Sequence, residues 1–290
     1  MAGSVLSYDP IRRYDITAED VEYRRDGQES WLARLYRPQG AGPFPALLDV
    51  HGGAWNSGDR TNNPTLAEGL AAGGVVVASI DFRMGGEHPY PSSLIDINYA
   101  TRWLKVHAAD FNADPATVGG LGVSSGGHLI MLSAMRPHDP RYTILPLAEA
   151  DGIDATLAYF ITCWGVLDPY GRYLMAEANG NKDLMANHDR YFLTVDAQKE
   201  ANPLMILRRG EQVTLPPALL IQGTADTGVP RGMIENVAEL YRAAGGDAEL
   251  ALFQDMPHGI AGWPEPEVAR MVERMKTFIA QRLMNPVAAG

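Results

Sequence analysis

The amino-acid sequence predicts an α/β fold with a mostly parallel central sheet and helices on both of its faces. Short apolar runs, such as the β-branched run 75–80 and the run 218–222, are typical of strands buried on both sides. Segments with apolar residues at helical spacing, such as 94–108 and 265–283, lie between or after these runs. Strands that alternate with helices in this way favour a sheet covered on both faces.

Composition indicates one globular domain over residues 1–290, with 46% hydrophobic and 20% charged residues. The net charge of −11 argues against a surface that binds nucleic-acid phosphates. The chain has one cysteine, Cys163, which excludes an intramolecular disulfide and a metal site built from several cysteines. We expect neither a metal nor another cofactor.

The sequence carries no recognisable targeting or membrane segment. Its first ten residues lack a basic region followed by a long apolar run, so no signal peptide is indicated. No apolar run reaches the roughly 18 residues that a membrane-spanning helix needs. We therefore expect a cytoplasmic protein that acts on a small molecule and has no membrane partner. The arm at 1–16 leaves a homo-oligomer open.

The first half of the chain is expected to supply a hairpin, two buried strands and two helices. Alternating residues on either side of Gly27 predict the antiparallel hairpin. The expected elements are an arm at 1–16, hairpin strands at 21–25 and 31–37, strands at 46–50 and 75–80, and helices at 64–72 and 94–108.

The second half is expected to continue the alternation of strands and helices. The segment at about 168–214 is rich in aromatic residues and methionine, and we interpret it as a cap-like insertion over the sheet rather than a separate domain. The other expected elements are a strand from about 117, a helix from 129 to about 135, a polar connection at 137–153, an apolar run at 155–164, strands at 218–222 and 248–254, and helices at 231–244 and 265–283.

The turn after the strand at 117 fits the pattern G-x-S-x-G. This pattern places a serine hydroxyl on a sharp strand-to-helix turn above a parallel sheet. Ser124 has glycines two residues before and after it, Gly122 and Gly126, which let neighbouring backbone pass close by. Ser125 would have Val123 in one of those places, so Ser124 is the candidate nucleophile.

A serine hydroxyl needs a base, and the base needs an acid that orients it. Asp226 follows the strand at 218–222, and His258 follows the strand at 248–254. Both residues are expected at the carboxyl edge of the sheet, where open α/β sheets bind ligands. The sequence therefore predicts a triad of Ser124, His258 and Asp226. Asp168, which follows an earlier apolar run, is a rival for the acid.

Ester or amide hydrolysis also needs donors for the developing oxyanion. The backbone N–H of Ser125, directly after the nucleophile, is one candidate. The turn after the strand at 46–50 offers the N–H groups of Gly53 and Ala54, with Gly52 shaping the turn.

These motifs together resemble those of the α/β-hydrolase superfamily. More narrowly, they are similar to the carboxylesterases that carry an HGG motif, near the hormone-sensitive-lipase-like esterases and the kynurenine-formamidase-like hydrolases. The resemblance implies an α/β-hydrolase fold with Ser124 as nucleophile, His258 as base and Asp226 as acid, and it spans roughly residues 20–283. The motifs are His51-Gly52-Gly53-Ala54-Trp55, Gly122-Val123-Ser124-Ser125-Gly126-Gly127-His128, Asp226-Thr227-Gly228-Val229-Pro230 and Pro257-His258-Gly259.

The chain departs from many members of this family at two positions. Ala54 stands where many relatives have a third glycine, which preserves the backbone donor and narrows the space around it. Ser125 stands where many have alanine, and its hydroxyl is expected either to bond locally or to touch the substrate. Both departures bear on the substrate class and leave the triad intact.

Three tryptophans follow a motif or strand at the catalytic edge. Trp55, Trp164 and Trp263 are candidates for lining the substrate pocket, with core packing as the alternative. His51, His88 and His128 are interpreted as structural. The aromatic residues of 168–214 either seal the cap onto the body or form a lid.

The leading function is a serine hydrolase that cleaves a carboxylic ester of a small, neutral, apolar or aryl-bearing substrate through an acyl-enzyme on Ser124. The same triad serves amide-type hydrolysis, of aryl-formamides or carbamates, and lactone hydrolysis. A ligand-binding protein on a hydrolase scaffold is the alternative without catalysis. A dinucleotide-binding oxidoreductase is disfavoured, because Ser125 stands where the third glycine of G-x-G-x-x-G belongs.

Overall fold

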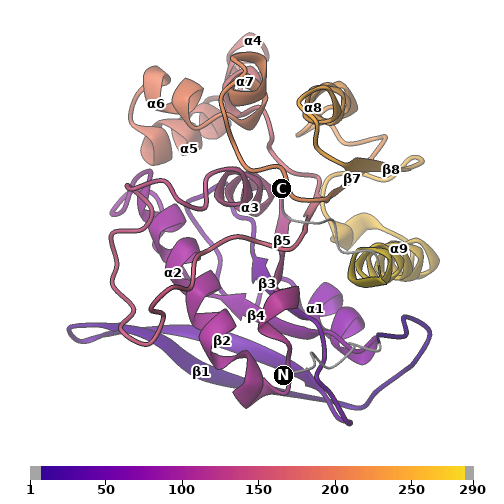
Figure 1. Ribbon diagram of the computed structural model, residues 1–290. Helices are drawn as coiled ribbons and strands as arrows, with labels where there is room; N and C mark the ends of the chain where they lie inside the picture. Colours follow the sequence, from indigo (N-terminus) through magenta and orange to yellow (C-terminus); the bar gives the residue numbers. More distant parts are fainter. Residues whose placement is uncertain (1–7, 285–290) are drawn as a thin grey trace.

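The computed structural model describes residues 8–284, and within that range eight strands form a single sheet (Figure 1). The strands are β1 (Ile16–Asp26), β2 (Glu29–Pro38), β3 (Ala46–Val50), β4 (Val76–Ile80), β5 (Gly119–Val123), β6 (Phe160–Cys163), β7 (Ala218–Gly223) and β8 (Ala248–Phe253). Their order across the sheet is β1-β2-β4-β3-β5-β6-β7-β8. β2 runs antiparallel to both β1 and β4, and the remaining pairs are parallel, so the carboxyl ends of β3 to β8 share one edge.

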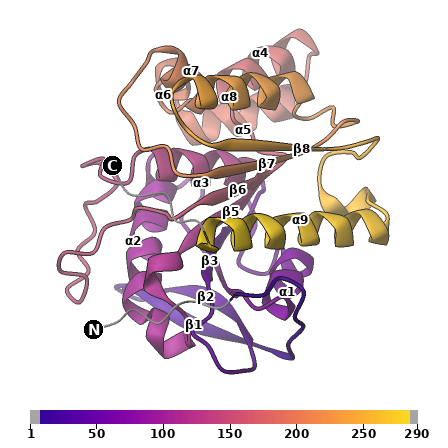
Figure 2. The same cartoon turned by 45° about the vertical axis from the view of Figure 1, so that its right-hand side comes forward.

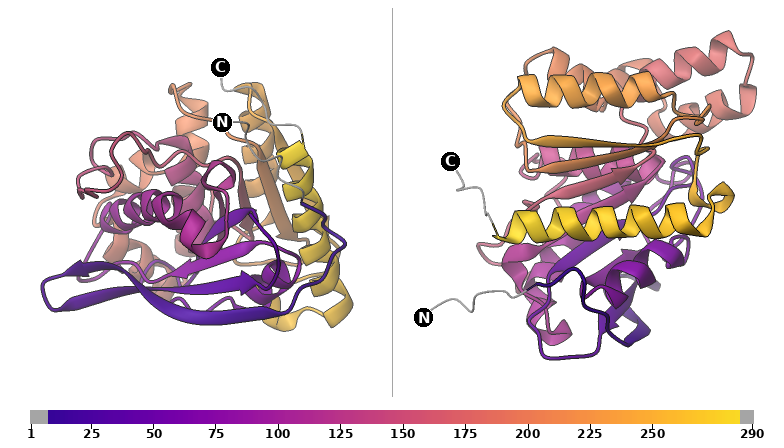
Figure 3. Two further views of the ribbon diagram at one scale, coloured as in Figure 1. Left: turned by 60° about the horizontal axis from the view of Figure 1, so that its bottom comes forward. Right: turned by 90° about the vertical axis from the view of Figure 1, so that its right-hand side faces the viewer.

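Helices cover both faces of the sheet, and a hydrophobic core lies beneath each set. The first core contains residues of α2, α3 and α8, and the second contains residues of α1 and α9. Figure 3 shows α9 lying along its face of the twisted sheet. These helices are α1 (Pro64–Ala72), α2 (Ser92–His107), α3 (Ser125–Met135), α8 (Arg231–Ala243) and α9 (Glu265–Met284), with short 3-10 turns at Ala108–Phe111, Pro115–Thr117 and Ile260–Gly262.

Four further helices follow β6 and precede β7 in the chain. They are grouped above α3 in the views of Figures 1 and 2. They are α4 (Pro169–Ala178), α5 (Lys182–Phe192), α6 (Val195–Glu200) and α7 (Pro203–Arg208), and we call them the cap. Each begins at a polar residue whose side chain accepts a backbone N–H of the first turn, a strong start signal. The capping residues are Asp168, Asn181, Thr194 and Asn202.

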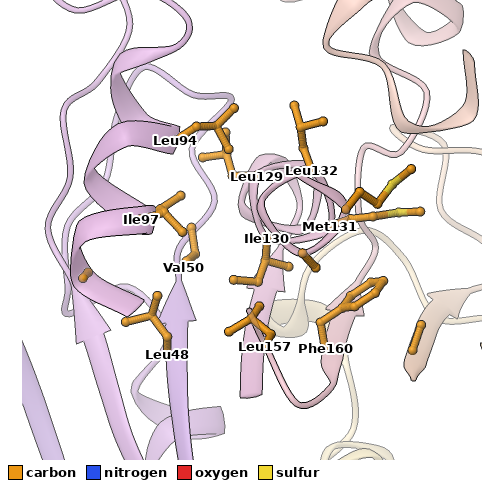
Figure 4. Packing of buried hydrophobic residues seen from close by; sticks show 14 of the residues in the cluster. Leu48, Val50, Leu94, Ile97, Leu129, Ile130, Met131, Leu132, Leu157 and Phe160 are labelled. Atoms are coloured by element: carbon orange, nitrogen blue, oxygen red, sulfur yellow. The ribbon is translucent and has the colours of Figure 1, made fainter. Parts of the chain in front are cut away.

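The first core is centred on α3, which lies beside α2 on the same face of the sheet (Figure 4). Leu129 and Ile130 on α3 are fully buried among side chains of β3, α2 and β6. This helix begins at Ser125, directly after Ser124, so its packing fixes the position of Ser124 above the sheet. The labelled neighbours are Leu48, Val50, Leu94, Ile97, Leu157 and Phe160.

The predicted sheet and its helices are confirmed, and several elements differ in extent. β1 begins at Ile16, five residues before the predicted strand at 21–25. α3 begins at Ser125, four residues before the predicted start at residue 129. The predicted start was late because Gly126 and Gly127 have low helix propensity. In the structure these glycines permit close packing. A Cβ on Gly126 would lie 2.1 Å from the Val50 carbonyl oxygen. The apolar run at 155–164 forms a strand only at Phe160–Cys163.

Of the predicted N-terminal arm, residues 1–7 lie outside the described residues. The remainder runs beside α1 and β1, where the Tyr14 N–H donates to the Ala72 carbonyl at 2.9 Å. No helix between residues 8 and 284 combines the length and the apolar character needed to cross a membrane.

Candidate active site

Ser124 lies on a sharp turn between β5 and α3. Its backbone angles, φ 53° and ψ −119°, are rare for a residue with a side chain and indicate local strain. The turn is possible because Gly122 and Gly126 pack in direct contact: a Cβ on Gly122 would lie 2.2 Å from the Gly126 carbonyl oxygen. The glycine spacing that selected Ser124 in the sequence therefore has a steric cause.

Backbone hydrogen bonds hold Ser124 in this strained conformation. Its N–H donates to the Cys163 carbonyl at 2.9 Å, which ties the turn to β6. Its carbonyl accepts the N–H groups of Gly127 and Val166, each at 3.0 Å. Ser124 remains partly exposed, whereas the neighbouring Ser125 is buried, so Ser124 is the serine that faces solvent at the sheet edge.

His258 and Asp226 form a hydrogen-bonded chain with Ser124. The distance from Ser124 Oγ to His258 Nε2 is 3.0 Å, and that from His258 Nδ1 to Asp226 Oδ2 is 2.8 Å. A carboxylate oxygen only accepts, so Nδ1 carries the proton and donates to Asp226. In the neutral ring, Nε2 is then free to accept the proton of the Ser124 hydroxyl. This is the geometry of an activated serine nucleophile.

Asp226 is buried but surrounded by donors. Oδ1 accepts the backbone N–H groups of Gly228 and Val229, each at 2.8 Å, and Oδ2 also accepts the Gln222 side chain at 2.7 Å. Burial acts to raise the pKa of Asp226, but the hydrogen bond and charge of His258, followed by the donors from Val229 and Gln222, hold that pKa below its ordinary value. Asp226 therefore stays ionised while buried.

The turn at 53–57, which we call the oxyanion turn, lies against Ser124. A Cβ on Gly52 would be 3.1 Å from the Cβ of Ser124. Gly53 and Ala54 both have positive φ, 110° and 51°. Within residues 8–284, the N–H groups of Gly53, Ala54 and Ser125 donate no hydrogen bond to another protein group. Unpaired backbone donors beside a nucleophile are suited to accept a developing oxyanion.

Ser125 and His128, both on α3, hold the next residue of the turn. The Trp55 N–H donates to the buried Ser125 hydroxyl at 3.1 Å, so this hydroxyl bonds locally. The Trp55 indole N–H donates to His128 Nδ1 at 3.1 Å, and His128 Nε2 donates to the Ala201 carbonyl at 2.7 Å. Burial lowers the pKa of His128 to about 4, which keeps the ring neutral.

The three predicted pocket tryptophans are all buried, with exposed fractions of 1%, 3% and 7% for Trp55, Trp164 and Trp263. Trp55 stacks on Tyr191 of α5, with ring centroids 5.5 Å apart. Trp164 lies with its ring centroid 6.4 Å from that of His258, and the Trp263 indole donates to the Pro257 carbonyl at 3.0 Å. These contacts fit the core-packing alternative, and the role of the three residues as a pocket lining stays a prediction.

The rival acid and the other motif histidine have different surroundings. Asp168 caps α4, where Oδ1 accepts the Gly171 N–H at 2.9 Å and the Asn202 side chain at 2.7 Å. His51 stacks on Phe82, with centroids 4.4 Å apart, and its Nδ1 lies 2.7 Å from the Gly52 carbonyl oxygen. Neither residue contacts Ser124 or His258.

The surroundings of the oxyanion turn include a cavity, and residues 8–284 contain no cluster of metal ligands. Within residues 8–284, no three His, Cys, Asp or Glu side chains are placed to hold a metal ion together. A cavity of about 870 Å³ opens beside the oxyanion turn, with Asn56, Asp59, Met84 and Arg190 in its wall. Ser124, Asp226 and His258 are not among its lining residues.

The sequence reasoning missed several residues that support the site. Gln222 and Arg172 are two of them: Gln222 donates to Asp226, and the Arg172 Nε donates to the Gly228 carbonyl at 3.0 Å. Asn56 was also missed. Gln222 left a signal, because it is a polar residue inside an otherwise apolar strand. No pattern in the sequence points to Arg172, because its partner lies more than 50 positions away in the chain.

A family sequence model, BD-FAE, matches residues 34–239, which is more than half of the chain. The chain belongs to the BD-FAE family. Among solved structures, the apo form of Thermogutta terrifontis esterase 2 matches with a TM-score of 0.74 and 24% identity, covering 94% of this chain and 97% of that one. The same esterase phosphorylated by paraoxon matches with a TM-score of 0.73 and 23% identity, covering 94% and 96%. With these neighbours, the α/β-hydrolase fold of this BD-FAE chain is confirmed.

Curated relatives of this BD-FAE chain come from Mycobacterium tuberculosis. The probable carboxylic ester hydrolase LipM is 26% identical over 270 residues, which is 87% of this chain and 60% of LipM. The esterase LipC is 29% identical over 225 residues, 72% of this chain and 52% of LipC. The carboxylesterase NlhH is 27% identical over 272 residues, 84% of this chain and 76% of NlhH. The chain thus spans little more than half the length of LipM and LipC.

Proposed function

We propose that the chain is a serine hydrolase that cleaves carboxylic esters of small, neutral substrates bearing apolar or aryl groups. The observation that carries the proposal is the hydrogen-bonded chain from Ser124 through His258 to Asp226, set beside unpaired backbone donors of the oxyanion turn. The names of LipM, LipC and NlhH, all esterases or ester hydrolases, support the same reaction class.

In the proposed reaction, Ser124 Oγ attacks the ester carbonyl carbon while its proton passes to His258 Nε2. Asp226 keeps Nδ1 as the donor and stabilises the imidazolium that forms. The negative charge on the carbonyl oxygen is met by the N–H groups of Gly53, Ala54 and Ser125. The alcohol leaves with the proton from His258. Water then attacks the acyl-enzyme by the same steps and releases the acid.

The preference for neutral substrates rests on charge. The net charge of −11 disfavours the approach of anions, and the buried carboxylate of Asp226 adds a fixed negative charge behind the site. Efficient turnover of phosphorylated esters without turnover of neutral ones would contradict this part of the proposal.

A burst assay tests the reaction class. The purified chain is mixed with a short-chain p-nitrophenyl ester, and nitrophenolate release is followed for wild type, Ser124→Ala and His258→Ala. We expect turnover in wild type and a fall of kcat by roughly 10⁴-fold or more in both variants, because the triad acts as a unit. A panel of lactones, carbamates and aryl-formamides then ranks the alternatives.

Folded wild-type protein that neither turns over the ester nor reacts with a fluorophosphonate probe would contradict serine catalysis. Equal turnover in wild type and Ser124→Ala would contradict it as well.

A further inference from the structure

Asn56 joins the oxyanion turn to the cap. Its side-chain Nδ2 donates to the Ala54 carbonyl at 2.5 Å and to the Asn187 carbonyl at 2.9 Å. Ala54 carries one of the proposed oxyanion donors, and Asn187 belongs to α5 of the cap. One side chain therefore bonds both the turn and the segment that covers it.

The turn needs such support because its backbone is unusual. Ala54 and Trp55 are consecutive residues with side chains, and both occupy the left-handed region, with φ of 51° and 65°. Non-glycine residues rarely adopt this region and keep it only where the surroundings fix them. The Gly85 N–H donates to the Trp55 carbonyl at 2.8 Å, and the Asn56 side chain fixes the carbonyl just before it.

The contacts determine the orientation of the Asn56 carboxamide. A carbonyl oxygen only accepts, so the group facing both Ala54 and Asn187 must be the donor, Nδ2. Rotating the amide by half a turn would place Oδ1 against two other oxygens. The Oδ1 atom is buried without a hydrogen-bond partner, so the two donor bonds are what hold this side chain in place.

We propose that Asn56 is a positioning residue for ester hydrolysis. It holds the Ala54 carbonyl, so that the backbone N–H of Ala54 is placed to donate to the oxyanion. Because Asn56 also bonds Asn187, this placement depends on the docking of α5 against the turn. The inference rests on the proposed function. Asn56 does not contact Ser124, His258 or Asp226, so it acts through the turn and not on the reacting atoms.

The first test compares Asn56→Ala with Asn98→Ala. Asn98 is a buried asparagine on α2 whose Nδ2 donates to the Pro137 carbonyl at 2.9 Å and whose Oδ1 accepts the Arg102 Nε–H at 3.0 Å. Its replacement therefore removes a comparable bond to a carbonyl, and one side-chain bond, away from the turn. We expect kcat of Asn56→Ala to fall by about 10- to 100-fold with little change in KM, because a displaced donor mainly affects the transition state. Asn98→Ala should keep wild-type kcat per folded molecule. Equal kcat in the two variants, at matched folded fraction from circular dichroism, would overturn the inference.

The second test uses Asn56→Asp, in which only the protonated carboxyl can donate to Ala54. Burial against the carbonyl oxygens of Ala54 and Asn187 should raise the pKa of the introduced carboxyl above its ordinary value of about 3.9. The ratio of variant to wild-type kcat should therefore rise severalfold as the pH falls from about 8 to about 4.5, because the carboxylate repels both carbonyls while the protonated acid restores one donor. Dividing by wild type at each pH removes the titration of the triad and of the charged or titratable neighbours that line the same cavity, which are Glu29, Asp59, Asp81, Glu87, His88 and Arg190. A ratio that stays constant with pH would overturn the inference.

The two proposals fail in different ways. If wild-type protein shows neither esterase activity nor a fluorophosphonate adduct, the proposed function and this inference are both wrong. If wild type is active, Ser124→Ala is inactive and the Asn56 variants match wild type, the proposed function stands and only the role of Asn56 is wrong.

Discussion

Asp226 and Asp168 show how surroundings give two similar residues different roles. Both follow a buried strand and both accept backbone N–H groups. Only Asp226 accepts from His258, and its second oxygen is occupied by the amides of its own loop. Oδ1 of Asp168 accepts both the Gly171 N–H, which starts α4, and the Asn202 side chain. Because only Asp226 is bonded to His258, we propose Asp226, and not Asp168, as the acid of the triad.

We predict that Asp226→Asn lowers kcat by about 10⁴-fold with a small change in stability, because the neutral amide no longer fixes the Nδ1–H tautomer of His258. Asp168→Asn is the matched control, and it should keep near-wild-type kcat because asparagine also caps helices. Steady-state hydrolysis of the p-nitrophenyl ester measures both. Loss of activity in Asp168→Asn with retention in Asp226→Asn would move the acid to residue 168.

At the scale of elements, Asp49 links three of them near the catalytic edge. It lies in β3, and it accepts the Ser79 hydroxyl of β4 at 2.6 Å and the Asn63 side chain, just before α1, at 3.0 Å. Burial raises the pKa of Asp49 to about 6, although both hydrogen bonds act to lower it. The folded protein therefore retains this proton in a pH range where the unfolded chain has lost it.

This difference predicts a pH-dependent stability. Because the folded pKa lies above the unfolded value, the stabilising contribution of Asp49 is complete below about pH 4 and is lost as the pH rises through about 6. In Asp49→Asn this dependence should disappear, changing the pH profile of the unfolding free energy by up to about 3 kcal/mol relative to wild type. Urea unfolding at several pH values measures it, and parallel profiles for the two proteins would refute it.

The sequence predicted strands and helices well wherever periodicity was strong. The strand Ala46–Val50 and the helix at residues 64–72 have the predicted bounds. The start of α3 was placed too late, since glycine lowers helix propensity while tight packing against β3 requires it there.

The contacts of the site were less accessible from the sequence. The candidate nucleophile, base and acid were placed by motif and by position after a strand, and the structure brings their side chains within hydrogen-bond distance. The bonds from Asn56 to Asn187 and from His128 to Ala201 join residues more than 70 positions apart. No local pattern specifies such pairs, because they depend on how the cap docks.

At the scale of the whole molecule, the cap shares a core with the sheet. Tyr191 and Phe192 of α5 are buried in the same cluster as Trp55 and the residues of α2 and α3. The His128 and Asn56 bonds add polar links across this contact. The cap is therefore joined to the body by both apolar packing and buried hydrogen bonds.

We predict that cap and body unfold together in one transition. Three of the five tryptophans, Trp55, Trp164 and Trp263, are buried around the site, so their fluorescence reports on it, while far-ultraviolet circular dichroism reports on all helices. The two urea transitions should coincide, as expected of a cooperative unit. A fluorescence change at lower urea than the loss of helix would show that the cap separates first.

The cap leaves the sheet after β6 and returns at β7, and these two strands are hydrogen-bonded neighbours. An engineer could exchange this insertion for one from a relative without cutting either strand or moving Ser124 and His258. The graft would nevertheless replace the partners of Trp55 and Asn56, which the native cap supplies through Tyr191 and Asn187. The inserted segment of a working chimera must therefore keep the residues that pack against Trp55 and bond the oxyanion turn, even when only its outer surface is redesigned.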